Sequence, residues 1–255
     1  MIAMLLNSTF VLAQDNIWQD ANLAAKTSGH MALSRYFDAD DQALRSKLSL
    51  VPNEIRGQTD TILLPMPDGS LAKFSIVESS IMEDGLAEEF PQIKSYKVYG
   101  IDDPTASGRV DMSPKGFRGM LMTTQGRVFI DPANGTSNRY TSNLTGSSSR
   151  SVQPFQCEVH ADSSSSSDMV NFSRNETLHR ISGSLITYRL AVSATSEYVN
   201  AVDGGATTDL AESNAVMAEI NTAINRVNQV YERDLGVRLL LVTGNSSLIE
   251  VSSAN

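Results

Sequence analysis

The chain contains a single cysteine, Cys157, among its 255 residues, which excludes an internal disulfide framework. Basic residues are also scarce, because 20 Lys and Arg stand against 29 Asp and Glu and leave a net charge of −9. Nucleic acids and anionic membranes attract clusters of Lys and Arg, so neither is expected as a partner. Hydrophobic residues nevertheless make up 41% of the chain, enough for the core of one large domain or two smaller ones.

No membrane span is expected at the N-terminus. Residues 1–13 are mostly apolar, but spanning a membrane takes about 20 residues. The stretch ends in Val11 and Ala13, which fits the small residues before a signal cleavage site, although the usual positively charged start is missing. We therefore expect a signal peptide over residues 1–13 and a secreted, extracellular protein. A buried N-terminus is the alternative.

The clearest secondary-structure pattern lies in residues 185–243. Its first eight residues, 185–192, are rich in β-branched, aromatic and aliphatic side chains and predict a strand. Asp209 can cap a helix, with a glutamate three residues later that reaches back to the cap. Gly236 can end this helix, and residues 237–243 resume as a buried strand. The segment predicts a β-α-β unit.

The predicted helix has an apolar and a polar side. Apolar residues recur every three or four positions from Val216 to Tyr231 and therefore share one face. Polar residues, including Asn221, Asn225 and Asn228, fall elsewhere. A two-stranded parallel sheet with one helix cannot cover itself, so either the N-terminal half completes this domain or the chain stops in the middle of it.

Two stretches of this unit resemble a known family. Residues 188–198 (YRLAVSATSEY) and residues 221–237 (NTAINRVNQVYERDLGV) are similar to the opening of the catalytic domain of reprolysin-like, adamalysin-type zinc metallopeptidases, which are metzincins. The resemblance covers residues 185–245. It implies hydrolysis of peptide bonds in protein or peptide substrates by zinc-activated water, in an active-site helix that carries HExxHxxGxxH and follows later in the domain.

That zinc motif is absent from this chain. The three histidines, His30, His160 and His179, include no pair four residues apart, and none is followed by glutamate. We expect no catalytic residue here, zinc only in the full-length enzyme, and no activity from this chain alone. The resemblance implies the N-terminal portion of a longer zymogen.

The N-terminal half predicts a different architecture. Residues 15–50 are helical in character, with candidate helices over residues 21–25 and 40–48. Five short strand-like runs separated by Pro- and Gly-bearing turns then indicate an antiparallel β domain from about residue 55. The runs are residues 61–64, 71–77, 94–99, 117–122 and 127–130. The expected fold class is therefore α+β or α/β: an antiparallel β-rich domain followed by the β-α-β opening of an incomplete metzincin domain.

The β-rich region also resembles a propeptide. Residues 74–82, 91–96 and 100–106 are similar to the region ahead of the catalytic domain in bacterial secreted reprolysin-like peptidases. The resemblance implies a propeptide domain that docks on its own catalytic domain. We expect four parts along the chain: signal peptide 1–13, propeptide domain 14–142, Ser-rich linker 143–182 and partial catalytic domain 183–255.

Cys157 lies within the expected linker and is the candidate metal ligand. A propeptide cysteine occupies the fourth zinc position in several metzincin zymogens, because thiolate displaces the catalytic water. The following residue is Glu158, however, whereas such switches usually have glycine there and a basic neighbour. Cys157 is therefore either an inhibitory zinc ligand or a free or downstream-paired structural cysteine.

A second class of function is open at this stage: a self-contained secreted module that binds or inhibits a peptidase. Two expectations follow from the zymogen hypothesis. The expected linker should be cut first in limited proteolysis. The strand over residues 237–243 should expose an apolar edge when residues 183–255 are isolated, because no later strand covers it.

Overall fold

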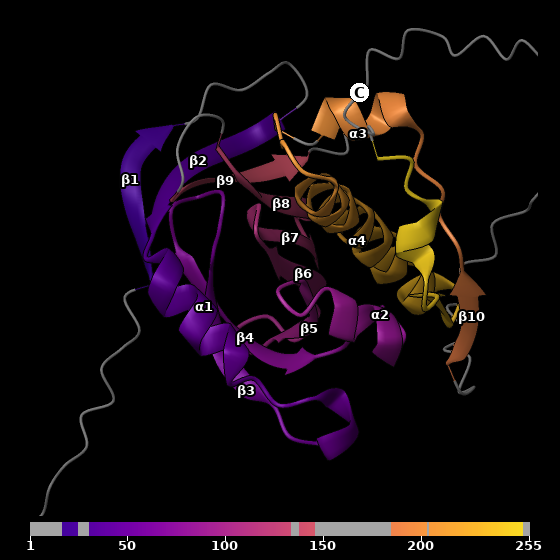
Figure 1. The fold of residues 1–255 in the computed structure, drawn as a ribbon. Helices are drawn as coiled ribbons and strands as arrows, with labels where there is room; N and C mark the ends of the chain where they lie inside the picture. The colour runs from indigo at the N-terminus through magenta and orange to yellow at the C-terminus, as the bar shows by residue number, and fades with distance from the viewer. Residues whose placement is uncertain (1–16, 25–30, 134–137, 146–184, 203, 252–255) are drawn as a thin grey trace, which may run out of the picture.

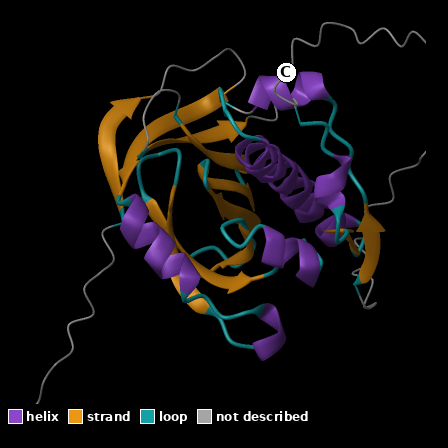
Figure 2. Ribbon diagram, in the orientation of Figure 1, coloured by secondary structure: helices purple, strands orange, loops and turns teal. Residues whose placement is uncertain are grey.

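The computed structural model describes residues 17–24, 31–133, 138–145, 185–202 and 204–251 (Figure 1). Loops join the helices and strands, and most strands belong to the N-terminal half (Figure 2). The strands are β1 (Trp18–Ala24), β2 (Met31–Ala39), β3 (Asp60–Pro65), β4 (Leu71–Glu78), β5 (Lys94–Gly100), β6 (Ser107–Ser113), β7 (Gly116–Thr123), β8 (Gly126–Pro132), β9 (Arg139–Thr145), β10 (Ile186–Leu190) and β11 (Val237–Leu241). The helices are α1 (Asp41–Ser49), α2 (Asp84–Glu89), α3 (Ser196–Val202) and α4 (Asp209–Asp234), with 3-10 turns η1 (Glu54–Arg56) and η2 (Asn245–Leu248). No helix among the described residues is long and apolar enough to cross a membrane.

A nine-stranded antiparallel sheet forms the larger part of the molecule. Its strand order is β1-β2-β9-β8-β7-β6-β5-β4-β3, so that only the pairing of β2 with β9 joins strands distant in sequence. The sheet bends into a half-barrel, which brings the edge strands β1 and β3 near each other (Figure 1). The five predicted strands are confirmed as β3, β4, β5, β7 and β8, and the antiparallel β domain is confirmed with them.

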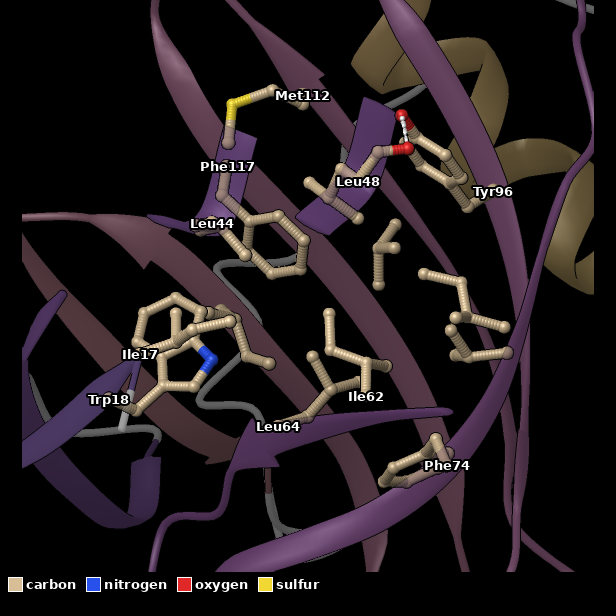
Figure 3. Packing of buried hydrophobic residues seen from close by; sticks show 14 of the residues in the cluster. Ile17, Trp18, Leu44, Leu48, Ile62, Leu64, Phe74, Tyr96, Met112 and Phe117 are labelled. Carbon is tan, nitrogen blue, oxygen red and sulfur yellow. Dashed lines mark hydrogen bonds between the residues drawn. The ribbon is translucent and has the colours of Figure 1, made fainter. Parts of the chain in front are cut away.

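The inner face of the half-barrel holds the main hydrophobic core. Helix α1 lies against it with Leu44 and Leu48 buried (Figure 3). Trp18 packs edge-on against Phe117 and Tyr140, at ring-centroid distances of 5.6 and 5.2 Å. Burying such aromatic and aliphatic surface is the main stabilising contribution to this half of the fold.

The prediction for residues 15–50 is only half right. The helix over residues 40–48 is confirmed as α1, and the Asp40 side chain caps it by accepting from the Ala43 amide at 2.9 Å. The helix over residues 21–25 is wrong, because residues 21–24 belong to β1, which pairs with β2. The helical character is also wrong for residues 31–39, which form β2. Alanine and leucine are good helix formers, but intrinsic propensity is a small free-energy term, and pairing at the sheet edge overrides it.

The β-α-β unit in the C-terminal part is confirmed. Strands β10 and β11 pair in parallel, from Ile186 opposite Val237 to Leu190 opposite Leu241. Helices α3 and α4 lie between the two strands in the chain. The helix cap is Thr208 rather than the predicted Asp209, which lies in the first turn. Gly236 follows the helix at φ 66° and ends it as predicted.

Two predicted parts lie outside the described residues. They are the signal peptide and the stretch 146–184, which contains most of the expected linker. Residues 143–145 of that linker belong to β9.

Candidate functional site

Among the described residues, a dense network of hydrogen bonds and ion pairs forms the contact between α4 and the sheet. Helix α4 lies on the outer face of β6 and β7, opposite the core that holds α1 (Figure 1). Alternation along β6 creates the two faces: Val110 and Met112 belong to the inner core, whereas Arg109 and Asp111 contact α4. The two halves of the chain therefore meet through a strand whose outer side chains are charged.

The side of α4 that faces the sheet is largely polar and buried. Its buried polar residues are Asn221, Thr222, Asn225, Asn228 and Gln229; Glu212, also buried, lies in the first turn of the helix. The sequence places Asn221, Asn225 and Asn228 off the apolar face of the helix, and the structure buries all three. The amides of Asn225 and Asn228 bond through both of their polar atoms to the sheet and to β11, which offsets the loss of water, whereas Asn221 bonds through its oxygen and its buried Nδ2 has no partner among the described residues.

Three amide groups of α4 bond to neighbouring strands of the sheet. Asn225 Nδ2 donates to the carbonyl of Val110 at 3.1 Å. Asn221 Oδ1 accepts from the Ser95 hydroxyl at 3.1 Å, and Gln229 Nε2 donates to the Ser107 hydroxyl at 3.1 Å. These bonds fix the position of α4 along β5 and β6.

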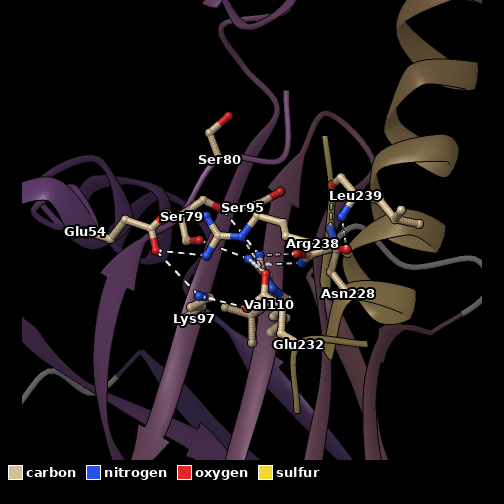
Figure 4. A network of polar contacts seen from close by, with 12 residues as sticks. Glu54, Ser79, Ser80, Ser95, Lys97, Val110, Asn228, Glu232, Arg238 and Leu239 are labelled. Carbon is tan, nitrogen blue, oxygen red and sulfur yellow. Dashed lines mark hydrogen bonds and ion pairs between the residues drawn. The ribbon is translucent and has the colours of Figure 1, made fainter. Parts of the chain in front are cut away.

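Asn228 ties α4 to its own β-α-β unit. Its side chain accepts from the Leu239 amide at 2.7 Å and donates to the Leu239 carbonyl at 2.8 Å (Figure 4). Both backbone groups of Leu239 are thus satisfied by one fully buried side chain. The same amide therefore holds β11 at a fixed distance from the helix.

Asp111 is buried in this contact and forms no direct ion pair with any of the described residues. Its carboxylate accepts from the Thr222 hydroxyl at 2.7 Å and from Asn225 Nδ2 at 3.3 Å, both neutral donors. Only 1% of the residue is exposed. Burial raises the pKa of Asp111 to about 6, because removal from water penalises the charged form more than the two hydrogen bonds favour it.

A cluster of charges flanks Asp111 on the β5 side. Arg109, which is 1% exposed, donates to Glu232 Oε1 at 2.8 Å and to Asn225 Oδ1 at 2.8 Å. Glu232 also pairs with Lys97 at 2.7 Å and with Arg238 at 2.6 Å (Figure 4). Burial lowers the pKa of Arg109, although its pairing with Glu232 opposes that shift. The cluster joins β5, β6, α4 and β11 in one network.

Glu54 extends this network to the turn η1. Its carboxylate pairs with Arg238 at 2.6 Å and with Lys97 at 3.5 Å. The pKa of Glu54 lies below its usual range despite partial burial, because the hydrogen bond and charge of Arg238 together outweigh the cost of desolvation. Three cations thus surround two carboxylates.

A second group of ion pairs flanks Asp111 on the β7 and β8 side. Glu219 of α4 pairs with Arg118 at 2.5 Å and with Lys115 at 2.8 Å. Arg226 of α4 pairs with Asp131 at 2.5 Å. Burial raises the pKa of Asp131, but the adjacent Arg226 charge opposes the shift. Both flanks of the contact are therefore stabilised by opposite charges across the two halves.

The N-terminal half also covers the outer edge of β11. Met82 forms a parallel bridge with Leu241, whose amide donates to the Ile81 carbonyl at 2.8 Å. Glu83 accepts from the Thr243 amide at 2.8 Å and from Arg189. The edge that the sequence leaves uncovered is therefore occupied by residues 81–83 in this chain.

An apolar cluster accompanies this edge contact. It is shared between the α2 region and the β-α-β unit, and its buried members are Met82, Leu86, Phe90, Ile93, Ala194, Val199, Val216, Met217, Ala218, Ile220, Leu241 and Ile249. Helix α4 thus buries an apolar stripe against the α2 region and a polar stripe against β6. Burial of the apolar stripe stabilises the contact through the hydrophobic effect, and the hydrogen bonds of the polar stripe define its geometry.

The described residues do not fit a zinc ion. They contain no histidine and no cysteine, because His30, Cys157, His160 and His179 all lie outside them. Among the described residues no group of three His, Cys, Asp or Glu side chains could hold a metal. Cys157 thus stays a prediction as an inhibitory ligand, and no catalytic step can be assigned to the described side chains.

Sequence reasoning missed Arg109, Asp111 and the buried asparagines. A usable signal exists, because Asn221, Asn225 and Asn228 recur at helical spacing although asparagine disfavours helix interiors. Such a cost is tolerated where buried amides have partners. No comparable local signal distinguishes the charged residues of β6 from ordinary surface residues.

Comparison with known proteins bears on the C-terminal part alone. No curated protein and no solved structure matches the chain. Residues 185–255, which contain β10, α4 and β11, match the family model described as metallo-peptidase family M12B, reprolysin-like. The match covers less than half of the chain and shows what residues 185–255 are similar to.

Proposed function

We propose that this chain is the N-terminal part of a secreted zinc endopeptidase zymogen. Residues 185–255 are the opening of the catalytic domain, and the bent sheet before them is the propeptide that docks on it. Peptide-bond hydrolysis then belongs to the full-length protein, whose zinc ligands come from residues other than those described. Protein or peptide chains are the substrates.

The observation that carries the proposal is the location of the family match. It begins at residue 185 and coincides with a β-α-β unit that the preceding sheet grips through α4 and β11. A preceding domain that binds the first helix of a peptidase fold, and holds it by buried charges, has the arrangement that a docked propeptide requires. Secretion rests on the apolar N-terminal stretch and its small-residue cleavage site.

The deciding experiment compares this chain with the product of the complete coding sequence. Both proteins are purified, their zinc content is measured, and hydrolysis of an unfolded protein substrate is followed with and without a zinc chelator. We expect bound zinc only in the longer product. Hydrolysis that the chelator abolishes should also occur only in the longer product, and only after its N-terminal part is removed. A complete product that carries HExxHxxGxxH but hydrolyses nothing would contradict the proposal, as would a coding sequence that ends at Asn255.

A control separates docking from general folding. Glu232→Gln retains the shape of the side chain but removes the charge that holds three cations. If the sheet is the propeptide, this variant of the complete protein becomes active earlier during processing than the wild type. Arg127→Gln, on the exposed end of β8, should process like the wild type.

A further inference from the structure

We propose that Asp111 makes the contact between the sheet and α4 sensitive to pH, so that α4 is held more tightly in mildly acidic than in neutral solution. The inference concerns the contact itself. Its meaning as control of propeptide release rests on the proposed function.

The geometry singles out Asp111 among the acids of the contact. Glu232 and Glu219 each pair with at least two cations, and Asp131 pairs with Arg226. Asp111 accepts only from the hydroxyl of Thr222 and the amide of Asn225. Neutral donors compensate a buried negative charge less than a cation does. Asp111 is therefore the acid whose ionisation opposes the contact most.

The charged groups around Asp111 come from three elements. Arg118 of β7 is its register partner, and Arg226 lies on α4; both favour the carboxylate but are engaged with Glu219 and Asp131. Arg109, two residues away on β6, is engaged with Glu232. The surrounding cations are thus matched by other acids and leave Asp111 with little net compensation.

Separation of α4 from the sheet would return Asp111 to water. The packed state therefore binds the proton more strongly than the separated state, with a pKa of about 6 against an ordinary value near 4. A raised carboxyl pKa means that the contact is strongest below the ordinary pKa and weakens as pH rises through the raised value. Between pH 5 and pH 7 the stability of the contact should fall about tenfold as an equilibrium constant.

The window above pH 5 isolates this effect from the ion pairs. Glu54, Glu219 and Glu232 all have a lowered pKa, so their pairs are charged throughout that window and weaken only in more acidic solution. Asp131 has a raised pKa and acts in the same direction as Asp111, but it keeps a direct cation. Asp131→Asn should therefore remove a smaller part of the pH response than Asp111→Asn and serves as the comparison.

Hydrogen exchange of the whole chain tests the proposal. Protection of the α4 amides is measured at pH 5 and pH 7, corrected for intrinsic exchange, with the β2 amides as internal reference. We expect α4 protection to fall about tenfold more than β2 protection in the wild type. The difference should largely vanish in Asp111→Asn and persist in Asp131→Asn.

A second variant covers the case in which Asp111→Asn fails to fold. Thr222→Val removes the hydroxyl that donates to the charged carboxylate, which raises the pKa of Asp111 further. The loss of α4 protection between pH 5 and pH 7 should then exceed the wild-type loss. Equal changes in α4 and β2, a wild-type response in Asp111→Asn, or no increase in Thr222→Val overturns the proposal. None of these readouts uses peptidase activity, so they stand apart from failure of the proposed function.

Discussion

At the scale of the residue, Arg109 is a buried side chain on which three other residues depend for a hydrogen-bond donor. It is buried between β6 and α4 and bonds to Glu232, Asn225 and Ser79. Replacing it with methionine would leave these groups without their common donor. We expect Arg109→Met to lower the free energy of unfolding by about 3–5 kcal/mol, measured by urea denaturation.

The control for Arg109 is Arg127, an exposed arginine of the same sheet. Arg127→Met should change the free energy of unfolding by less than about 0.5 kcal/mol. Equal effects of the two substitutions would show that the burial and pairing of Arg109 add nothing to the free energy of unfolding.

Asn228 provides a second test at this scale. Its amide satisfies both the amide and the carbonyl of Leu239, so Asn228→Ala leaves two backbone groups without a partner. We expect a loss of about 2–3 kcal/mol in the free energy of unfolding, although alanine is the better helix former. The reverse exchange, Ala223→Asn on the exposed side of α4, should cost only about 0.5 kcal/mol.

At the scale of the element, the sequence predicts those parts whose signal is local. Helix α4 ends before Gly236, as the sequence indicates, and α1 covers most of the predicted residues 40–48. Strand β1 was missed because its conformation depends on pairing with β2, a contact that no local pattern encodes. The burial of the polar side of α4 was missed for the same reason: hydrophobic periodicity finds buried faces only where they are apolar, whereas β6 offers partners for an amide.

The junction of α2 with β11 allows a test of packing between elements. A Cβ atom at Gly85 would lie 2.6 Å from Cγ2 of Thr243, closer than van der Waals contact allows. We expect Gly85→Ala to destabilise the chain despite the better helix propensity of alanine. In the Thr243→Ala background the same substitution should instead be neutral or stabilising, because the obstructing methyl group is gone. Urea denaturation of the four variants measures the coupling, and additive effects would refute the contact.

At the scale of the whole molecule, the two halves should stay together after the chain between them is cut. Limited proteolysis is expected to cut first within residues 146–182, and the products should co-elute in gel filtration at pH 5. The charge network and the shared apolar cluster hold them without a covalent link. Products that separate at once would contradict the contact, and equal cutting elsewhere would contradict the linker.

Isolation of residues 183–255 should have the opposite outcome. The apolar stripe of α4 and the end of β11 lose the cover of Met82, Leu86 and Phe90. We expect this fragment to aggregate or to bind a hydrophobic dye strongly, and addition of the separately produced sheet domain to suppress both. A monomeric fragment that binds no dye would show that β10, α4 and β11 need no partner.

The order of the elements along the chain has a consequence for biosynthesis. The last strand of the sheet ends at Thr145, and β10 begins at Ile186, so a ribosome completes the docking face before it makes the helix that occupies it. Domains generally fold as they emerge, with the N-terminal one first. The β-α-β unit is therefore synthesised after the sheet on which it packs. Its apolar surface can be covered as soon as the unit folds.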